Sequence, residues 1–325
     1  MITMTEIARL THVSQSTVSR VLNGNPKVDP ETRERVLACA QEHNYQLNAL
    51  AKGLQGSRTQ LIGVILTDIS NGFFADLAKQ IELEARKKGY SMILFNSRYD
   101  QTLEREYMNV VRRYHVDGVL AVPIHENSRE WAESARELDI PVVVVTRHAE
   151  GMDSVHLDHD RAGELVAGHL LERGYERFLF LGRSYDVKYI GFQRGLAKLG
   201  VDPGRSVQSI EFHDDEQLLR DLDNYFQINE PYRIGIFAYN DICAIHGLEV
   251  LRRLHIPVTQ RCGIIGFDDT EMSAYMAPKL SSVAQPIQEM AAEAVSRLIS
   301  RIEEPGPHPV WNRTLQPSLA IKEST

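Results

Sequence analysis

The sequence has little of what marks exported or membrane proteins. Its three cysteines, Cys39, Cys243 and Cys262, lie far apart and form no C-x-x-C motif, which argues against a disulfide framework and favours a reducing compartment. The longest apolar run, residues 140–145, is far shorter than the roughly 20 residues that span a bilayer. No basic-then-apolar leader opens the chain. We therefore expect a cytoplasmic protein with no membrane contact.

Motifs of the common enzyme classes are also missing. The sequence has no G-x-G-x-x-G after an expected strand, no phosphate-binding P-loop and no H-E-x-x-H. No serine or cysteine stands in a nucleophile elbow. The 12 histidines are scattered, and His156 and His159 are three positions apart without the helix and carboxylate context of a metal-binding motif. The sequence therefore predicts no catalytic residue, no metal site and no cofactor. A sugar-processing enzyme stays an alternative that turnover of a ligand would reveal.

The net charge of −8 looks unsuitable for nucleic-acid binding until it is divided along the chain. Residues 1–58 contain seven Lys and Arg against five Asp and Glu, a balance of +2, so the remaining residues carry −10. A small basic segment can approach phosphates, whereas the acidic remainder is repelled by them. With 325 residues, 43% of them hydrophobic, the chain can form two or three domains with ample cores.

Residues 13–23, VSQSTVSRVLN, have the pattern of a short helix with one polar face. Ser14 suits its N-cap, and three apolar residues then recur at helical spacing, which gives one buried stripe. Asn23-Gly24 suits its end. The other face carries short or forked hydrogen-bonding side chains: Gln15, Ser16, Ser19 and Arg20.

A second short helix is expected just before this one, over residues 4–11, where Thr3 and Glu6 have the spacing of a capping box. Two short helices joined by a tight turn, the second one polar, indicate a helix-turn-helix whose second helix enters the major groove. A small helical hairpin packed on a larger domain is the alternative, but its exposed face would more often be rich in Glu and Lys. A third helix is expected over about residues 30–43, capped by Asp29.

This segment resembles the headpiece of the LacI/GalR family of bacterial repressors. The match rests on VSQSTVSRVLNG, TRERV at 32–36 and Asn44-Tyr45, and family motifs continue downstream. His12 departs from the pattern, because the family's turn usually has glycine there. The resemblance implies a headpiece over 1–46. The DNA contacts it implies there and in the next segment are Thr3, Ser14, Gln15, Ser16, Thr17, Ser19, Arg20, Asn23, Asn48 and Leu54.

The same resemblance implies a hinge over residues 47–58. Two such hinges would fold only when paired in the minor groove, with Leu54 wedged between base pairs, a known means of kinking DNA. A plain linker is the alternative. Glycine at position 53 and leucine rather than proline at position 47 are departures that favour it.

From Leu61 onward, β-branched segments alternate with amphipathic ones, which predicts parallel sheets covered on both faces. The resemblance implies a two-lobed α/β core over 59–325, like type I periplasmic binding proteins, with the chain crossing between lobes near residues 154, 284 and 304. Lobe 1 is then expected over about 59–153 and 285–304, and lobe 2 over about 154–284 and 305–325. Strands are expected over 61–67, 91–95, 117–122, 140–146, 178–182, 207–212, 233–238, 262–267 and 314–321.

Ligands of open α/β sheets bind beyond the carboxyl ends of the strands. Aromatic rings, carboxylates, amides and cations occur at those ends here, a mixture that suits a hydroxyl-rich solute. FAYND (237–241), GFDD (266–269) and LSSVAQP (280–286) also resemble the family's strand-end motifs. Asp241 could instead cap the following helix, and the two phenylalanines could be core. The candidate effector-binding residues are Asp68, Phe73, Phe74, Arg147, Lys188, Asn240, Asp241, Asp268 and Gln285.

Two cations decide the expected effector. Lys188 stands where the family's ligand-binding arginine is usual, and a lysine replaces a bidentate guanidinium poorly. Together with Arg147 it favours an effector with a carboxylate or phosphate. We expect a homodimeric repressor that reads a pseudo-palindromic operator and is controlled by a carbohydrate-like effector. A solute-binding sensor whose headpiece contacts another protein is the alternative.

Overall fold

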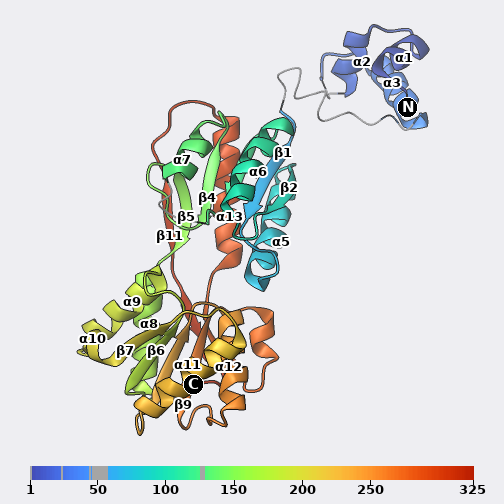
Figure 1. Cartoon of the computed structure of the whole chain (residues 1–325). Helices are drawn as coiled ribbons and strands as arrows, with labels where there is room; N and C mark the ends of the chain where they lie inside the picture. The colour runs from blue at the N-terminus through green and yellow to red at the C-terminus, as the bar shows by residue number, and fades with distance from the viewer. Residues whose placement is uncertain (1, 23–24, 44, 46–57, 125–128) are drawn as a thin grey trace. The chain divides into compact units, whose positions relative to one another are not determined.

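A computed structural model describes residues 2–22, 25–43, 45, 58–124 and 129–325. The chain forms two compact units, Met1–Gln60 and Leu61–Thr325 (Figure 1). Asn23, Asn48 and Leu54, and the expected hinge up to residue 57, lie outside the described residues. Among the described helices, none is long and apolar enough to cross a membrane.

The first unit is a three-helix cluster of α1 (Met4–Leu10), α2 (Gln15–Leu22) and α3 (Pro30–Glu42). Thr3 and Glu6 form the expected capping box: the Glu6 carboxylate accepts from the Thr3 amide at 2.8 Å, and the Thr3 hydroxyl accepts from the Glu6 amide at 3.2 Å. Ile7, Val18 and Val36 contribute one side chain from each helix to the core, and all three are fully buried.

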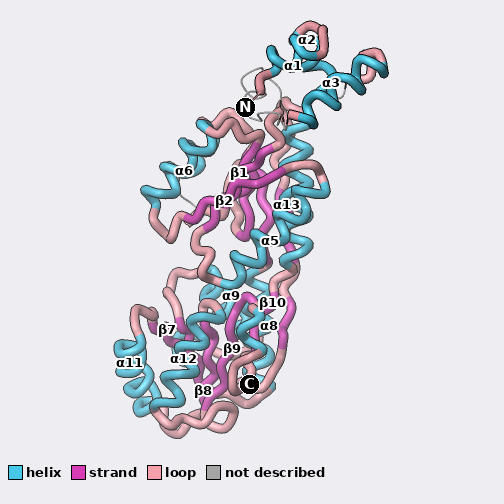
Figure 2. The backbone as a smooth tube through the Cα atoms, turned by 90° about the vertical axis from the view of Figure 1, so that its right-hand side faces the viewer, coloured by secondary structure: helices cyan, strands magenta, loops and turns pink. Residues whose placement is uncertain are grey.

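The second unit consists of two lobes, each built on a sheet of six strands among the described residues. The first sheet is entirely parallel, with strand order β11-β5-β4-β3-β1-β2. In both views α13 runs beside α5 along this sheet (Figures 1 and 2). The strands are β1 (Leu61–Leu66), β2 (Ser91–Asn96), β3 (Gly118–Ala121), β4 (Val142–Thr146), β5 (Asp153–Leu157) and β11 (Asn312–Leu315). The helices are α5 (Gly72–Lys87), α6 (Gln101–Arg113), α7 (Arg129–Arg136) and α13 (Ile287–Glu303).

The second sheet has the order β12-β10-β9-β8-β6-β7, and only β12 is antiparallel to its neighbour. Phe178, Phe180 and Phe237 fill its interior and are fully buried. The strands are β6 (Arg177–Leu181), β7 (Val207–Ile210), β8 (Ile234–Ala238), β9 (Cys262–Asp268), β10 (Ser281–Ala284) and β12 (Ser318–Ala320). The helices are α8 (His159–Glu172), α9 (Val187–Lys198), α10 (Pro203–Ser206), α11 (Asp215–Ile228), α12 (Asp241–Arg253) and the 3-10 turn η1 (Glu271–Ala274).

The lobe boundaries differ from those expected. β5 pairs with β4 and β11 in the first sheet, so the chain leaves the first lobe after Leu157 rather than near residue 154. The strand expected over 314–321 is two strands in different sheets, because Gln316 and Pro317 separate β11 from β12. The third crossing therefore follows Leu315 instead of residue 304. The crossing near residue 284 lies where it was expected, between β10 and α13.

Helices α8 and α9 of the second lobe pack backbone against backbone. An added Cβ at Gly163 would lie 2.1 Å from the carbonyl carbon of Gly191, and one at Gly195 would lie 2.8 Å from the Cα of Glu164. Real Cβ contacts are never this short, so side chains at these positions would force the helices apart. Gly168, on the same α8, has no atom within 4 Å of its added Cβ.

Candidate functional site

Helix α2 presents an exposed polar face on the first unit. Gln15, Ser16 and Arg20 are exposed, and Thr17 and Ser19 are partly exposed. Residues 13–22 contain no acidic side chain, so nothing on the helix itself repels phosphates. Amide, hydroxyl and guanidinium groups are the ones that hydrogen-bond base edges in the major groove. The face therefore has the chemistry of a recognition helix.

Ser14 and Thr3 act at the starts of helices, which distinguishes them from the exposed polar residues within α2. The Ser14 hydroxyl accepts from the Thr17 amide at 3.1 Å and lies 2.8 Å from the Ser16 and Thr17 hydroxyls. Thr3 is engaged in its capping box. Both hydroxyls satisfy orphan amides at helix starts, so they fix the geometry of the motif whether or not they also meet DNA.

The turn between α1 and α2 shows why glycine would suit it. His12 has a φ of 55°, the left-handed region that residues with a Cβ rarely adopt. The Val13 amide donates to the Ala8 carbonyl at 3.0 Å across this turn, which holds the strained conformation. Histidine in place of glycine at position 12 thus raises the conformational free energy of the turn and leaves its backbone shape unchanged.

A cavity open to solvent lies between the two lobes of the second unit, and its empty space, counted together with that open solvent, is about 520 Å³. Seven of the nine candidate effector-binding residues line it: Phe73, Phe74, Arg147, Lys188, Asn240, Asp268 and Gln285. The other lining residues are Asn71, Tyr99, Thr146, His159, Asp186, Val187, Tyr239 and Phe267. Side chains from both sheets and from the crossing at Gln285 therefore surround one space.

Asp68 and Asp241 do not line the cavity. The Asp68 carboxylate accepts from the amide and the hydroxyl of Ser70, at 3.0 and 2.8 Å, in the turn before α5. Asp241 is 1% exposed and accepts from the Ser282 hydroxyl at 2.6 Å and the Thr270 amide at 2.7 Å. The capping considered for Asp241 falls on Asn240, whose side chain accepts from the Cys243 amide at 2.8 Å.

Lys188 is held by the protein on several sides. Its Nζ donates to the Tyr239 carbonyl at 2.7 Å and lies 3.9 Å from the centre of the Phe267 ring. Burial lowers the pKa of Lys188, against the opposing effect of the Asp268 carboxylate. The protein's own groups therefore already surround the Lys188 ammonium, which leaves less of its charge for a ligand.

Asp268 is the buried carboxyl of the cavity, 5% exposed. The Gln285 amide donates to its Oδ1 at 2.7 Å. Burial raises the pKa of Asp268 to about 7, against the lowering effects of Lys188 and the Gln285 hydrogen bond. Near neutral pH this group can both accept and donate hydrogen bonds, as a ligand hydroxyl requires.

His159 forms part of the apolar wall. Its ring packs 5.8 Å from the Phe267 ring, centre to centre. Burial lowers its pKa to about 3, helped by the nearby Lys188 and Arg147 cations. The imidazole is therefore neutral at physiological pH. Its Nδ1 is buried and has no hydrogen-bond partner within the described part of the chain.

Three cavity residues have strained backbones. Tyr99, Thr146 and Asp268 have φ values of 56°, 72° and 107°. Positive φ is a genuine outlier for a β-branched residue such as Thr146, and each such residue costs of order 1–3 kcal/mol. Strain of this kind clusters at ligand sites, where the surrounding structure enforces it.

Five of the eight missed lining residues fall into two groups. Thr146, Tyr239 and Phe267 directly precede the candidates Arg147, Asn240 and Asp268, so applying the strand-end rule one residue earlier would have found them. Asn71 and Asp186 accept from backbone amides at the starts of α5 and α9, which the sequence signals only as caps. The loop carrying Tyr99 gives no comparable signal.

Comparisons with known proteins agree with this architecture. The family profile "Bacterial regulatory proteins, lacI family" matches residues 3–48, and "Periplasmic binding protein-like domain" matches residues 167–325. The HTH-type transcriptional regulator DegA of Bacillus subtilis is 31% identical, over 99% of this chain and 98% of its own. Catabolite control protein A of Priestia megaterium is 32% identical over 92% of each chain.

Solved structures give the same result. A LacI family regulator from Enterococcus faecalis with bound ribose is 29% identical, with a TM-score of 0.70 over 82% of this chain and 98% of that one. The lac repressor dimer bound to operator is 21% identical and has a TM-score of 0.85 over 99% and 98% of the two chains, a likeness of fold alone.

The expected helix-turn-helix and two-lobed α/β fold are thereby confirmed, and so is the resemblance on which the function was predicted. Relatives that match along nearly their whole length carry the names of transcriptional regulators and repressors rather than of enzymes. The chain belongs to the lacI family of bacterial regulatory proteins and is a DNA-binding transcriptional regulator.

Proposed function

We propose that the protein is a cytoplasmic, homodimeric repressor whose operator binding is controlled by a neutral, hydroxyl-rich effector held between the lobes. The observation that carries this proposal is the cavity itself, since groups from both lobes converge on one space. A ligand that touches both lobes binds their closed arrangement more tightly and so shifts the equilibrium between closed and open forms.

Operator reading is assigned to the exposed face of α2. One headpiece per subunit reads one half-site, so a dimer requires a pseudo-palindromic operator. Gln15, Ser16 and Arg20 are exposed and carry the groups that pair with base edges.

Replacing Gln15 and Ser16 together with alanine is expected to change the consensus recovered in an operator selection. Non-specific DNA affinity should stay within about threefold, because phosphate contacts supply it and carry no sequence information. A matched variant, Gln41→Ala on the exposed face of α3, should retain the original consensus. An unchanged consensus in the double variant would remove base reading from these two residues.

The chemistry of the cavity favours a neutral polyol over the anion that the sequence indicated. The anionic effector was expected from two cations, Lys188 and Arg147. Lys188 donates to the Tyr239 carbonyl and lies near Asp268, so protein groups already offset part of its charge. Asp186 and Asp268 place two carboxyl groups beside the two cations. Aromatic rings for sugar faces and forked polar groups for hydroxyls complete the set. Relatives solved with ribose and with D-xylulofuranose, both neutral sugars, support this class of effector.

A thermal-shift panel tests this ranking. D-Ribose, D-xylulose and common hexoses are compared with their phosphate esters, and we expect a neutral sugar to stabilise the protein more than its ester. A ligand at a hundred times its Kd adds about 2.7 kcal/mol to the free energy of unfolding, which is readily measured. Stabilisation by the esters alone would restore the anionic effector, and no response to any sugar would contradict the proposed effector class.

A further inference from the structure

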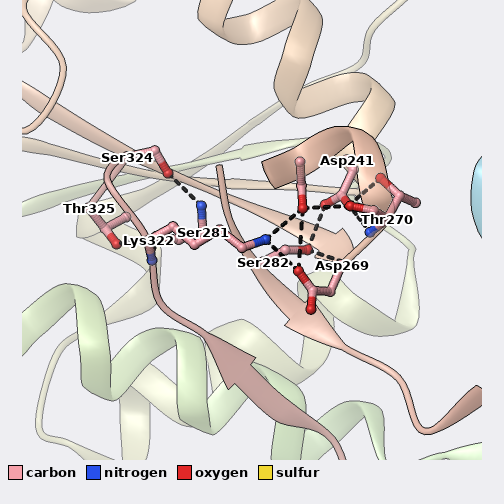
Figure 3. A network of polar contacts seen from close by, with 9 residues as sticks. Asp241, Asp269, Thr270, Ser281, Ser282, Lys322, Ser324 and Thr325 are labelled. Carbon is pink, nitrogen blue, oxygen red and sulfur yellow. Dashed lines mark hydrogen bonds and ion pairs between the residues drawn. The ribbon is translucent and has the colours of Figure 1, made fainter. Parts of the chain in front are cut away.

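The segment Lys322–Thr325 is fixed against the second sheet (Figure 3). The Ser324 hydroxyl donates to the Ile264 carbonyl at 2.6 Å and accepts from the Ser281 amide at 2.8 Å. The Thr325 hydroxyl lies 2.8 Å from the Ser281 hydroxyl and 2.9 Å from Nε2 of His169. Ser324 is 0% exposed and Thr325 is 7% exposed. The backbone of this segment is therefore held in place, and with it the position from which the Lys322 side chain extends.

Lys322 extends from that segment to the turn that follows β9. Its Nζ lies 2.6 Å from Oδ1 of Asp269 and 2.6 Å from the Ser273 hydroxyl. The two side chains of the ion pair are 20% and 29% exposed, so water screens them only in part. Figure 3 shows Lys322 and Asp269 on opposite sides of this contact. The pair joins the anchored segment to the residue after Asp268.

The turn at Asp268 and Asp269 needs such support. Both residues have positive φ, at 107° and 52°. Neither is glycine, the residue that adopts such backbone angles without strain. On its other side the Asp269 amide donates to the Ser282 hydroxyl at 3.0 Å, and Ser282 donates to Asp241. The side chain of Asp269 is thus held by Lys322 at 2.6 Å and, at the longer distance of 3.3 Å, by the Ser273 hydroxyl, and its backbone is held by Ser282.

We propose that Lys322 is a positioning residue for effector binding. Its ammonium group holds Asp269, and through that residue it fixes the backbone that aims the Asp268 carboxyl into the cavity. Lys322 and Asp269 do not line the cavity, so this action is indirect. The inference rests on the proposed function in one respect, namely that the cavity binds the effector.

Removing the ammonium group should loosen the turn specifically. A charge-assisted hydrogen bond that is partly shielded from water is among the stronger ones, and the left-handed backbone relaxes when its support is lost. The anchoring of Ser324 and Thr325 does not depend on the Lys322 side chain. The lobe should therefore keep its fold while the turn samples other conformations.

Hydrogen exchange of the full-length protein tests this without any ligand. In Lys322→Met, peptides covering residues 267–275 should exchange about tenfold faster than in wild type. Lys322→Arg should recover most of the protection. Lys279→Met is the matched control, because Lys279 pairs with Glu323 of the same segment at 3.3 Å and does not contact Asp269. Wild-type exchange in Lys322→Met, or equal loss in Lys279→Met, would overturn the inference.

Calorimetry with D-ribose tests whether the contact made by Lys322 supports effector binding. Lys322→Met should bind ribose about tenfold more weakly than wild type, and its operator affinity without sugar should be unchanged. The double variant Asp269→Ala with Lys322→Met should lose no more ribose affinity than Asp269→Ala alone. Unchanged ribose affinity in Lys322→Met would refute the positioning role. If wild type binds neither ribose nor another sugar of the panel, the proposed effector class fails, and the exchange experiment still decides whether Lys322 fixes the turn.

Discussion

Gly163→Ala is expected to lower the free energy of unfolding of the second unit by more than about 4 kcal/mol. The new methyl group would lie 2.1 Å from the carbonyl carbon and 2.3 Å from the amide nitrogen of neighbouring residues in α9. Backbone atoms cannot rotate away as a side chain can, so α8 and α9 must separate along their contact. Overpacking alone typically costs 1–3 kcal/mol, roughly, and here the core between the helices opens as well. Chemical denaturation followed by circular dichroism measures the loss.

Gly168→Ala on the same helix provides the control. Its methyl group meets nothing within 4 Å, and alanine stabilises a helix interior by about 0.8–1 kcal/mol over glycine. The two variants make the same chemical change in α8 and should move stability in opposite directions. Should Gly163→Ala be insoluble, Gly195→Ala, with a contact of 2.8 Å, should show a smaller loss. Near-wild-type stability of Gly163→Ala would contradict the observed helix contact.

Asp268→Ala is expected to weaken effector binding about 100-fold, equivalent to roughly 2.7 kcal/mol. The substitution removes a buried carboxyl, leaves the Gln285 amide without its acceptor, and takes away the nearby carboxyl that favours the charged form of Lys188. Unpaired buried polar groups retain their desolvation cost, which ligand binding then increases. Calorimetry with the sugar selected by the thermal-shift panel gives the affinity, and operator titration without sugar should match wild type.

Asp68→Ala separates this effect from the general loss of a strand-end carboxylate. Asp68 follows β1, was also a candidate from the sequence, and bonds Ser70 outside the cavity. Its replacement should leave sugar affinity within about twofold. If Asp268→Ala binds sugar like wild type, or if Asp68→Ala loses as much, the assignment of Asp268 to the site is wrong.

The strands that could be predicted are those whose own residues determine burial. β1 and β8 are continuous apolar runs, and both lie within a residue or so of their expected bounds. β5 and β10 were not predicted, because each contains polar residues that are buried: Asp153 is 4% exposed and Ser282 is 0% exposed. Asp153 is paired with two arginines of α13, and Ser282 is bonded to Asp241. Such compensation comes from distant parts of the chain, so no local pattern reveals it.

The candidate site divides in the same way. Arg147, Asn240 and Asp268 could be found because the carboxyl ends of parallel strands meet at one edge, and the structure places all three at the cavity. What the sequence could not decide was the direction of each side chain. Asp241 follows Asn240 directly, yet it points to Ser282 and Thr270, because the start of α12 turns it into the lobe. A hydroxyl 41 positions later determines that outcome.

The three crossings between the lobes also determine when the protein can fold during its synthesis. The first lobe begins at Leu61, but α13, which packs on its strands β3, β4 and β5, starts only at Ile287. Ribosomes add about 5–20 residues per second, so completing the 141 residues from the end of β4 to the start of α13 takes roughly 7–28 s. Throughout that interval the first sheet is without the apolar face of α13, including Leu298, which is fully buried in the finished protein. The second lobe is made within the same interval, so during synthesis the earlier lobe is the one that waits longest with its apolar surface uncovered.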